Sequence, residues 1–185
     1  MQVFFTNSDP KISAHNIHFR FADGSYKLSK KMVLESFQLL CLQIKQDGFC
    51  DNPPVGAPAA HISHESRMWL DHSTGNVRWL LDHANALVSL SGCPNGKKLN
   101  ADSISFLNST IKRHYPKSPV TPAALAMRST SLDLCQKYGT LIENALTYTG
   151  KPKTFFLGKT IDSTVTAYRT FLSRKDYFNP KHAIV

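Results

Sequence analysis

The chain has 185 residues, of which 42% are hydrophobic and 19% are charged, and this composition suits one globular domain. Its apolar and aromatic content excludes a disordered tail. No apolar run approaches the ~20 residues that a membrane-spanning helix needs, so we expect no membrane partner. Lys and Arg number 22 and Asp and Glu number 13, which gives a formal net charge of +9. Such a surplus favours an anionic partner, first nucleic acid and second a nucleotide.

The chain start and the cysteines both indicate a reducing compartment. Residues 1–5 lack the basic start and the long apolar stretch of a secretion signal, so we expect the protein in the cytoplasm of the producing cell. The four cysteines form no C-x-x-C pair. We therefore expect reduced thiols, with one of them, Cys41, in the core; the others are Cys50, Cys93 and Cys135.

The first half of the chain predicts helices after a short β-prone opening at residues 3–5. A polar loop follows through Asn7, Asp9 and Pro10, and residues 11–28 are ambiguous. Apolar residues then recur at helical spacing and predict a helix over 29–46, with Ser29 as its N-cap and Gly48 as its C-cap glycine. Three prolines and a glycine within residues 49–60 predict a loop.

The second half continues this mainly α pattern. We expect a short helix over 61–70, a longer one from an N-cap at Ser73 to residue 91, and a third over 101–114 capped by Asn100. Prolines make 115–123 irregular. The remaining expected elements are a helix over 129–148 interrupted at Gly139, a strand over 153–157 that pairs with residues 2–6, and a helix that is capped by Asp162 and runs to about Arg174. The fold prediction is one compact, mainly α domain over residues 1–185, with five to six helices and a small two-stranded β element.

Histidines concentrate before the middle of the chain. His61 and His64 are three residues apart and share a face if the segment is helical, so they can converge on a metal or a phosphate. The spacing is not H-E-x-x-H, and the simpler interpretation is a pair of hydrogen-bonded side chains at a helix start. We predict no metal and no cofactor, and we regard both residues as candidates for proton transfer near neutral pH.

Lys31 and Glu35 are four residues apart within the helix predicted over 29–46. The simplest interpretation is an ion pair across one turn. The functional alternative is a carboxylate that faces a pocket beside a cation that meets phosphate. Such a carboxylate stabilises the sugar cation that forms when a glycosidic bond breaks.

Trp69, Asn76 and Trp79 flank a predicted junction between two helices. Their spacing favours core positions for both tryptophans. The alternative is an indole on a pocket rim that stacks on a base, a contact worth ~1–3 kcal/mol. Asn76 is either structural or reads a base edge.

Basic residues occur in short groups along the chain. Each group alone is typical of a solvated face, but the acidic residues do not balance their sum. If the groups form one face, phosphate contacts make binding strongly dependent on salt. The groups are Lys97 with Lys98, Lys112 to His114, Lys151 with Lys153, Arg169, and Arg174 with Lys175.

Five segments stand out together, in chain order: KMVLESFQLLC (31–41), HISHESRMW (61–69), NVRWL (76–80) followed by His83, TPAALAM (121–127), and AYRTF (167–171) followed by Lys175. They resemble the signatures of a family of small bacteriophage proteins, some of which carry the label of pyrimidine-dimer DNA glycosylase. The chain also departs from the family. Asp71 stands where relatives tend to have Arg, residues 15–30 are longer, and residues 128–160 resemble an insertion. Gln2 is large, so Met1 is expected to stay, which argues against an N-terminal amine as nucleophile.

The resemblance implies a phage protein that acts on DNA or nucleotides in the infected host cell, and in its most specific form a hydrolase that excises a damaged or modified base. Excision requires extrusion of the base from the stack. In this hypothesis Glu35 is the catalytic carboxylate, and His61 and His64 carry protons or bind phosphate. Lys31, Arg78, Arg169 and Lys175 bind the backbone, and Trp69 and Asn76 line the base pocket. Two alternatives remain: a non-catalytic protein that binds host nucleic acid or a host protein, and an enzyme that acts on nucleotides.

Overall fold

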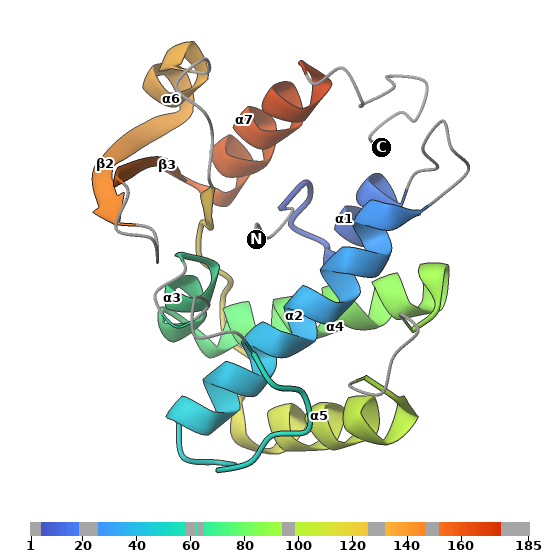
Figure 1. The fold of residues 1–185 in the computed structure, drawn as a ribbon. Coiled ribbons are helices and arrows are strands. Elements are labelled where there is room, and N and C mark those ends of the chain that lie inside the picture. The colour runs from blue at the N-terminus through green and yellow to red at the C-terminus, as the bar shows by residue number, and fades with distance from the viewer. Residues whose placement is uncertain are drawn as a thin grey trace.

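A computed structural model of the protein describes residues 5–18, 26–57, 62, 65–93, 99–125, 132–146 and 152–174. Within these residues the chain forms seven α-helices and one small antiparallel sheet (Figure 1), which confirms the mainly α prediction. None of the described helices is long and apolar enough to cross a membrane. The helices are α1 (Pro10–Ile17), α2 (Lys27–Gln46), α3 (Glu65–Asp71), α4 (Thr74–Ser91), α5 (Ala101–His114), α6 (Leu132–Tyr138) and α7 (Ile161–Ser173). The strands are β1 (Ala124–Leu125), β2 (Gly139–Leu146) and β3 (Pro152–Gly158).

Helix α1 occupies part of the segment predicted to be a polar loop or ambiguous. Asp9 is its N-cap, and the Asp9 Oδ1 atom accepts hydrogen bonds from the backbone N–H groups of Lys11 (2.8 Å) and Ile12 (3.3 Å). Pro10 is the first helical residue, where the missing N–H costs nothing. The prediction of a loop through Pro10 is therefore wrong, because Asp followed by Pro is itself a helix-start signal.

Helix α2 begins two residues earlier than predicted and ends as predicted. Ser29 lies inside the first turn, where its hydroxyl donates to the carbonyl of Tyr26 (3.1 Å), so it is not the N-cap. At the other end Gly48 has a φ of 74°. The N–H of Gly48 donates to the carbonyl of Lys45 (3.1 Å) and the N–H of Phe49 to that of Ile44 (2.9 Å). This pair of bonds is a Schellman motif, and it fixes the direction in which the chain leaves α2.

Helices α4 and α5 confirm the predicted boundaries and caps. The Ser73 hydroxyl accepts from the N–H of Gly75 (3.1 Å) at the start of α4, and Gly92 ends that helix. Asn100 accepts from the N–H of Ser103 (2.9 Å) at the start of α5. At the start of α7, in contrast, Thr160 is the N-cap, and Asp162 lies in the first turn.

The sheet has three strands in the order β1-β3-β2, where two were predicted, and β3 contains the predicted strand over 153–157. β3 pairs with β1 and β2, so the predicted pairing with residues 2–6 is wrong for Phe5 and Thr6, which are not in a strand. The predicted helix over 129–148 is also wrong over residues 139–146, which form strand β2. Strand β2 begins there at Gly139, where an added Cβ would lie 2.2 Å from the carbonyl oxygen of Leu157. Only glycine tolerates that approach of the two strands.

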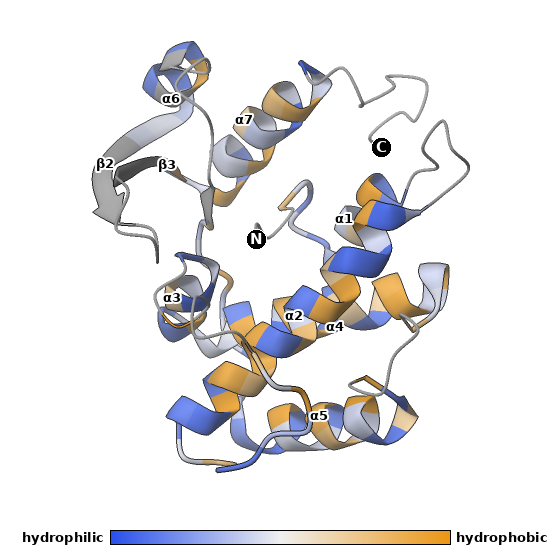
Figure 2. Ribbon diagram, viewed as in Figure 1, coloured by the Kyte–Doolittle hydropathy of each residue, from blue (hydrophilic) through white to orange (hydrophobic). Residues whose placement is uncertain are grey.

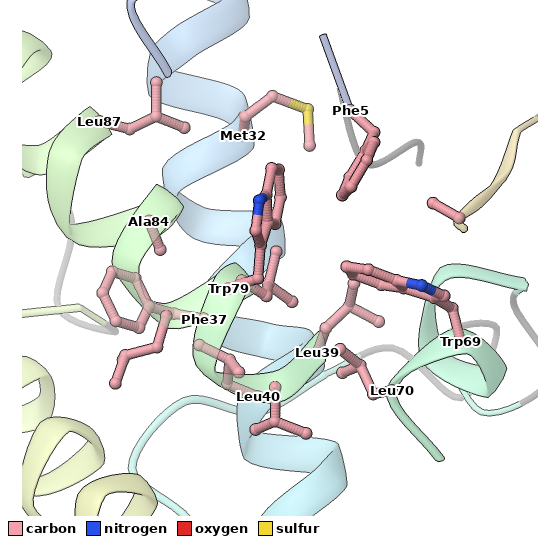
Figure 3. Close-up of a cluster of buried hydrophobic side chains, with 14 of the residues drawn as sticks. Phe5, Met32, Phe37, Leu39, Leu40, Trp69, Leu70, Trp79, Ala84 and Leu87 are labelled. Atoms are coloured by element: carbon pink, nitrogen blue, oxygen red, sulfur yellow. The ribbon is translucent and has the colours of Figure 1, made fainter. Parts of the chain in front are cut away.

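The core centres on the packing of α1 and α2 against α4, and Figure 2 shows hydrophobic residues along α4 and along the turns of α2 that cross it. Three aromatic rings join these helices to the N-terminal segment and α3 (Figure 3). The ring centroid of Phe5 lies 4.6 Å from that of Trp79 and 5.8 Å from that of Trp69. Cys41 lies in the core as predicted, and burial raises the pKa of its thiol to about 11, so it stays protonated.

Candidate nucleic-acid interface

The carboxyl end of α5 is held by a side chain from α4. Arg78 donates from Nε to the carbonyl of Tyr115 (2.6 Å) and from Nη2 to the carbonyl of Lys112 (3.0 Å). Carbonyls in the last turn of a helix lack partners within the helix, and the negative end of the helix dipole lies there. Arg78 therefore satisfies both carbonyls and adds a positive charge at the end of α5.

Further basic side chains lie at the same place. Lys112, Arg113, His114 and Lys117 are all exposed. The ion pairs among the described residues join Lys31 to Glu35, Arg67 to Asp71 and Arg174 to Asp133, so none of them neutralises this group. We call the five residues that lie here the α5 basic end: Arg78, Lys112, Arg113, His114 and Lys117.

An aromatic side chain from another part of the chain packs on the α5 basic end. The Schellman motif after α2 places Phe49 so that its ring stacks on the imidazole of His114, with centroids 4.3 Å apart and planes at 19°. The ring of Tyr115 lies perpendicular to that of Phe49, with centroids 5.5 Å apart. Phe49 still exposes 40% of its surface. From the sequence, Phe49 was assigned only to a loop. The glycine cap before it was nevertheless a signal that the backbone direction at Phe49 is fixed.

The acidic groups near the α5 basic end are engaged by internal donors. Gln43 donates from Nε2 to Asp47 (3.1 Å) and to Asp71 (3.0 Å), and Arg67 binds both oxygens of Asp71. The hydroxyl of Tyr115 also donates to Asp47. Burial, and then the Asp47 carboxylate, hold the pKa of Tyr115 well above its usual range, so the phenol remains a donor. These bonds join α2, α3 and the end of α5 directly beside the cations.

Glu35 forms the ion pair that its spacing predicts, but with one oxygen only. Its Oε1 lies 3.7 Å from the ammonium of Lys31, which is largely exposed. The Glu35 side chain is 15% exposed, and its Oε2 is buried with no hydrogen-bond partner in the described part of the chain. A buried carboxylate oxygen without a donor is costly, and such groups concentrate where a protein does chemistry.

Trp69 and Asn76, predicted to line a base pocket, both lie in the core. Trp69 is 1% exposed and donates from Nε1 to the carbonyl of Thr121 (3.0 Å). Asn76 is fully buried and donates from Nδ2 to the carbonyl of Trp69 (2.7 Å) and to the hydroxyl of Thr121 (2.7 Å). The N–H of Thr121 returns a bond to the Asn76 Oδ1 atom (2.8 Å). In this structure neither side chain presents a surface to a ligand.

The other predicted site residues are dispersed. Arg169 lies on α7 and donates from Nε to the carbonyl of Thr6 (2.8 Å), whereas α5 lies at the opposite end of the molecule (Figure 1). The predicted backbone-binding set is therefore not one surface, and of its described members only Arg78 belongs to the α5 basic end. His61, His64 and Lys175 lie outside the described residues. Among the residues that the structure describes, no group of three or more His, Cys, Asp or Glu side chains is arranged to hold a metal ion.

Comparison with protein-family models, with curated proteins and with solved structures gave no match. The family resemblance inferred from the sequence therefore stays a prediction.

Proposed function

We propose that this protein binds DNA, and that the α5 basic end contacts the phosphates. One observation carries the proposal: Lys112, Arg113 and Lys117 are exposed at one end of one helix, and no described carboxylate pairs with them. Cations that contact several phosphates displace condensed counterions, which is the main source of affinity for DNA. The net charge of +9 and the resemblance to phage proteins that act on DNA in the infected cell support the same conclusion.

The helix itself suits this role. Leu107 and Ile111 bury one side of α5, while Ser109, Lys112 and Arg113 are partly or fully exposed. Because Arg78 holds the last turn in place, the cations project from a fixed backbone and not from a free terminus. A fixed array loses less conformational entropy when it binds a regular partner such as a phosphate backbone.

The test is the affinity for a short labelled DNA across a salt series, measured by fluorescence anisotropy. The variant combines Lys112→Ala, Arg113→Ala and Lys117→Ala. Each phosphate contact contributes about 0.9 to the slope of log affinity against log salt, so we expect the slope to fall by about 2–3. At low salt we expect a loss of affinity of about 10-fold or more.

A matched control variant separates the effect of where the cations lie from the effect of the net charge. The control combines Lys11→Ala, Lys30→Ala and Lys159→Ala, three exposed cations on other elements. Both variants reduce the net charge equally, from +9 to 9 − 3 = +6. We expect the control to keep most of the affinity and slope. Equal losses in both variants would contradict an interface at the α5 basic end, and no DNA binding at low salt would leave a nucleotide or a host protein as the partner.

A second candidate function, excision of a base from DNA, is favoured by Glu35. Its buried Oε2 has no donor among the described residues, and the Lys31 ammonium lies beside its Oε1. A carboxylate in that state stabilises the positive charge that develops on the sugar as the glycosidic bond breaks, or it transfers a proton.

The test of this second function is single-turnover excision on duplexes that carry damaged or modified bases. Glu35→Gln keeps the shape of the side chain and removes the charge, so we expect a rate loss of about 100-fold or more. Asp133→Asn is the control, because Asp133 is also an ion-paired carboxylate but is exposed. A Glu35→Gln protein with full activity would exclude Glu35 as the catalytic carboxylate.

A further inference from the structure

We propose that the stacked pair of Phe49 and His114 is a site for an unpaired nucleobase, so that the protein prefers single-stranded DNA over duplex. This inference rests on the proposed function, because it takes the α5 basic end as the place where DNA binds. The proposed function concerns the phosphates that the cations contact. This inference adds a second recognised part of the ligand, a base with an uncovered face.

The geometry of Phe49 is that of a fixed platform. Its backbone N–H is bonded within the Schellman motif, one face of its ring covers His114, and the ring of Tyr115 lies perpendicular to it. The Phe49 side chain is nevertheless 40% exposed, so part of the ring is open to a ligand. A base that stacks on this exposed part extends an existing aromatic stack.

The cations around the pair fit a strand and not an isolated base. Arg113 immediately precedes His114 in the chain, and Lys117 follows three residues later, and both are exposed. A base on Phe49 therefore has cations close by to contact its flanking phosphates. Aromatic platforms beside a cationic path are the usual means of binding single strands without sequence preference.

The preference for a single strand follows from access to the base. In a duplex both faces of each base are covered by its neighbours. The free energy needed to extrude a base from the stack therefore lowers the affinity for a duplex. In a single strand a base reaches the ring without that cost. Stacking of one base on an aromatic side chain is worth a factor of about 5 to 150 in affinity.

The experiment compares two single strands with the same number of phosphates, an oligothymidine and an abasic strand of equal length, with a duplex of that length as a third probe. For the wild-type protein we expect the oligothymidine to bind about 5- to 150-fold more tightly than the abasic strand. Phe49→Leu keeps an apolar side chain but removes the ring, so this ratio should fall toward 1. A ratio near 1 for the wild-type protein, or an unchanged ratio in the variant, would overturn the inference.

Phe106 supplies a matched control, because it is 39% exposed and lies two turns earlier on α5, with no ring partner among the described residues. Phe106→Leu should leave the ratio unchanged. An equal fall in both variants would indicate general loss of exposed aromatic surface and would also overturn the inference.

A second variant gives a direct readout. Phe49→Trp keeps a stacking ring and adds a fluorophore, while Trp69 and Trp79 are 1% and 3% exposed and contribute a constant background. We expect oligothymidine, and not the abasic strand, to quench the new fluorescence; no quenching at saturation would contradict stacking. If neither the single strands nor the duplex bind the wild-type protein at low salt, the proposed function fails, whereas equal binding of the two single strands refutes only the base site.

Discussion

Single buried polar side chains join elements that are far apart in the sequence. His83 lies on α4, is almost fully buried, stacks on Trp79 with centroids 4.9 Å apart, and bonds through Nδ1 to the carbonyl of Pro10 (3.0 Å). Because that carbonyl can only accept, Nδ1 carries the proton. Burial lowers the pKa of His83 to about 4 against the weaker, opposing effect of the Pro10 bond. The imidazole is therefore neutral in the folded protein at neutral pH.

This shift predicts acid sensitivity. The unfolded chain binds a proton at His83 near pH 6.5 and the folded protein only near pH 4, so the stability that His83 contributes is complete above pH 6.5 and is lost as the pH falls toward 4. The loss is on the order of 2 kcal/mol by pH 5. Urea denaturation of wild type and His83→Phe across this range measures it. We expect the difference in unfolding free energy to move in favour of the variant as the pH falls, and parallel curves would contradict the assignment.

For some single residues the sequence pattern left two roles open, a core position and contact with a base. The spacing of Trp69 favoured a core position, and a stacking role remained as the alternative; the structure buries its ring against Phe5 and Trp79. For Asn76 the sequence also left two roles open, a structural one and the reading of a base edge. Three hydrogen bonds to Trp69 and Thr121 now engage its side chain inside the protein. Burial depends on neighbours about 50 positions away, which no local pattern contains.

At the scale of elements, the helix ends were the most predictable features. Ser73, Asn100 and Gly48 act within two or three residues of themselves, so the local sequence suffices to place them. Strand β2 was predicted as helix because its conformation depends on β3, which pairs with it through Gly139 and Gly158. The alternation of apolar residues in so short a segment is ambiguous until a partner strand is known.

Arg78 is expected to stabilise the carboxyl end of helix α5. It satisfies two carbonyls at the end of α5, so we expect Arg78→Leu to lower the free energy of unfolding by about 1–3 kcal/mol, because the half-buried bond to the carbonyl of Tyr115 would be lost. Arg113→Leu, on the exposed side of the same turn, should change stability by less than about 0.5 kcal/mol. Urea denaturation of both variants makes the comparison. Equal stability of the two would show that Arg78 does not hold the helix end.

At the scale of the whole molecule, the cations of the described residues do not form one face. Arg169 and Arg174 on or after α7 bind Thr6 and Asp133, whereas the cations at the end of α5 remain without carboxylate partners in the described residues. Asp47 and Asp71 bond to Gln43, Tyr115 and Arg67, and neither forms an ion pair with these cations. The resulting imbalance at one end of the molecule is the physical basis of the proposed DNA contact.

Periodicity, capping residues and composition were enough to predict the helical class, many helix boundaries and the net charge, because each acts locally or is a simple sum. The ion pair of Lys31 and Glu35, which are one turn apart, was predictable for the same reason. The gathering of cations at the end of α5 and the stacking of Phe49 on His114 were not predictable, since these contacts join residues that are tens of positions apart. Such contacts depend on how the helices pack, and packing is a property of the whole chain.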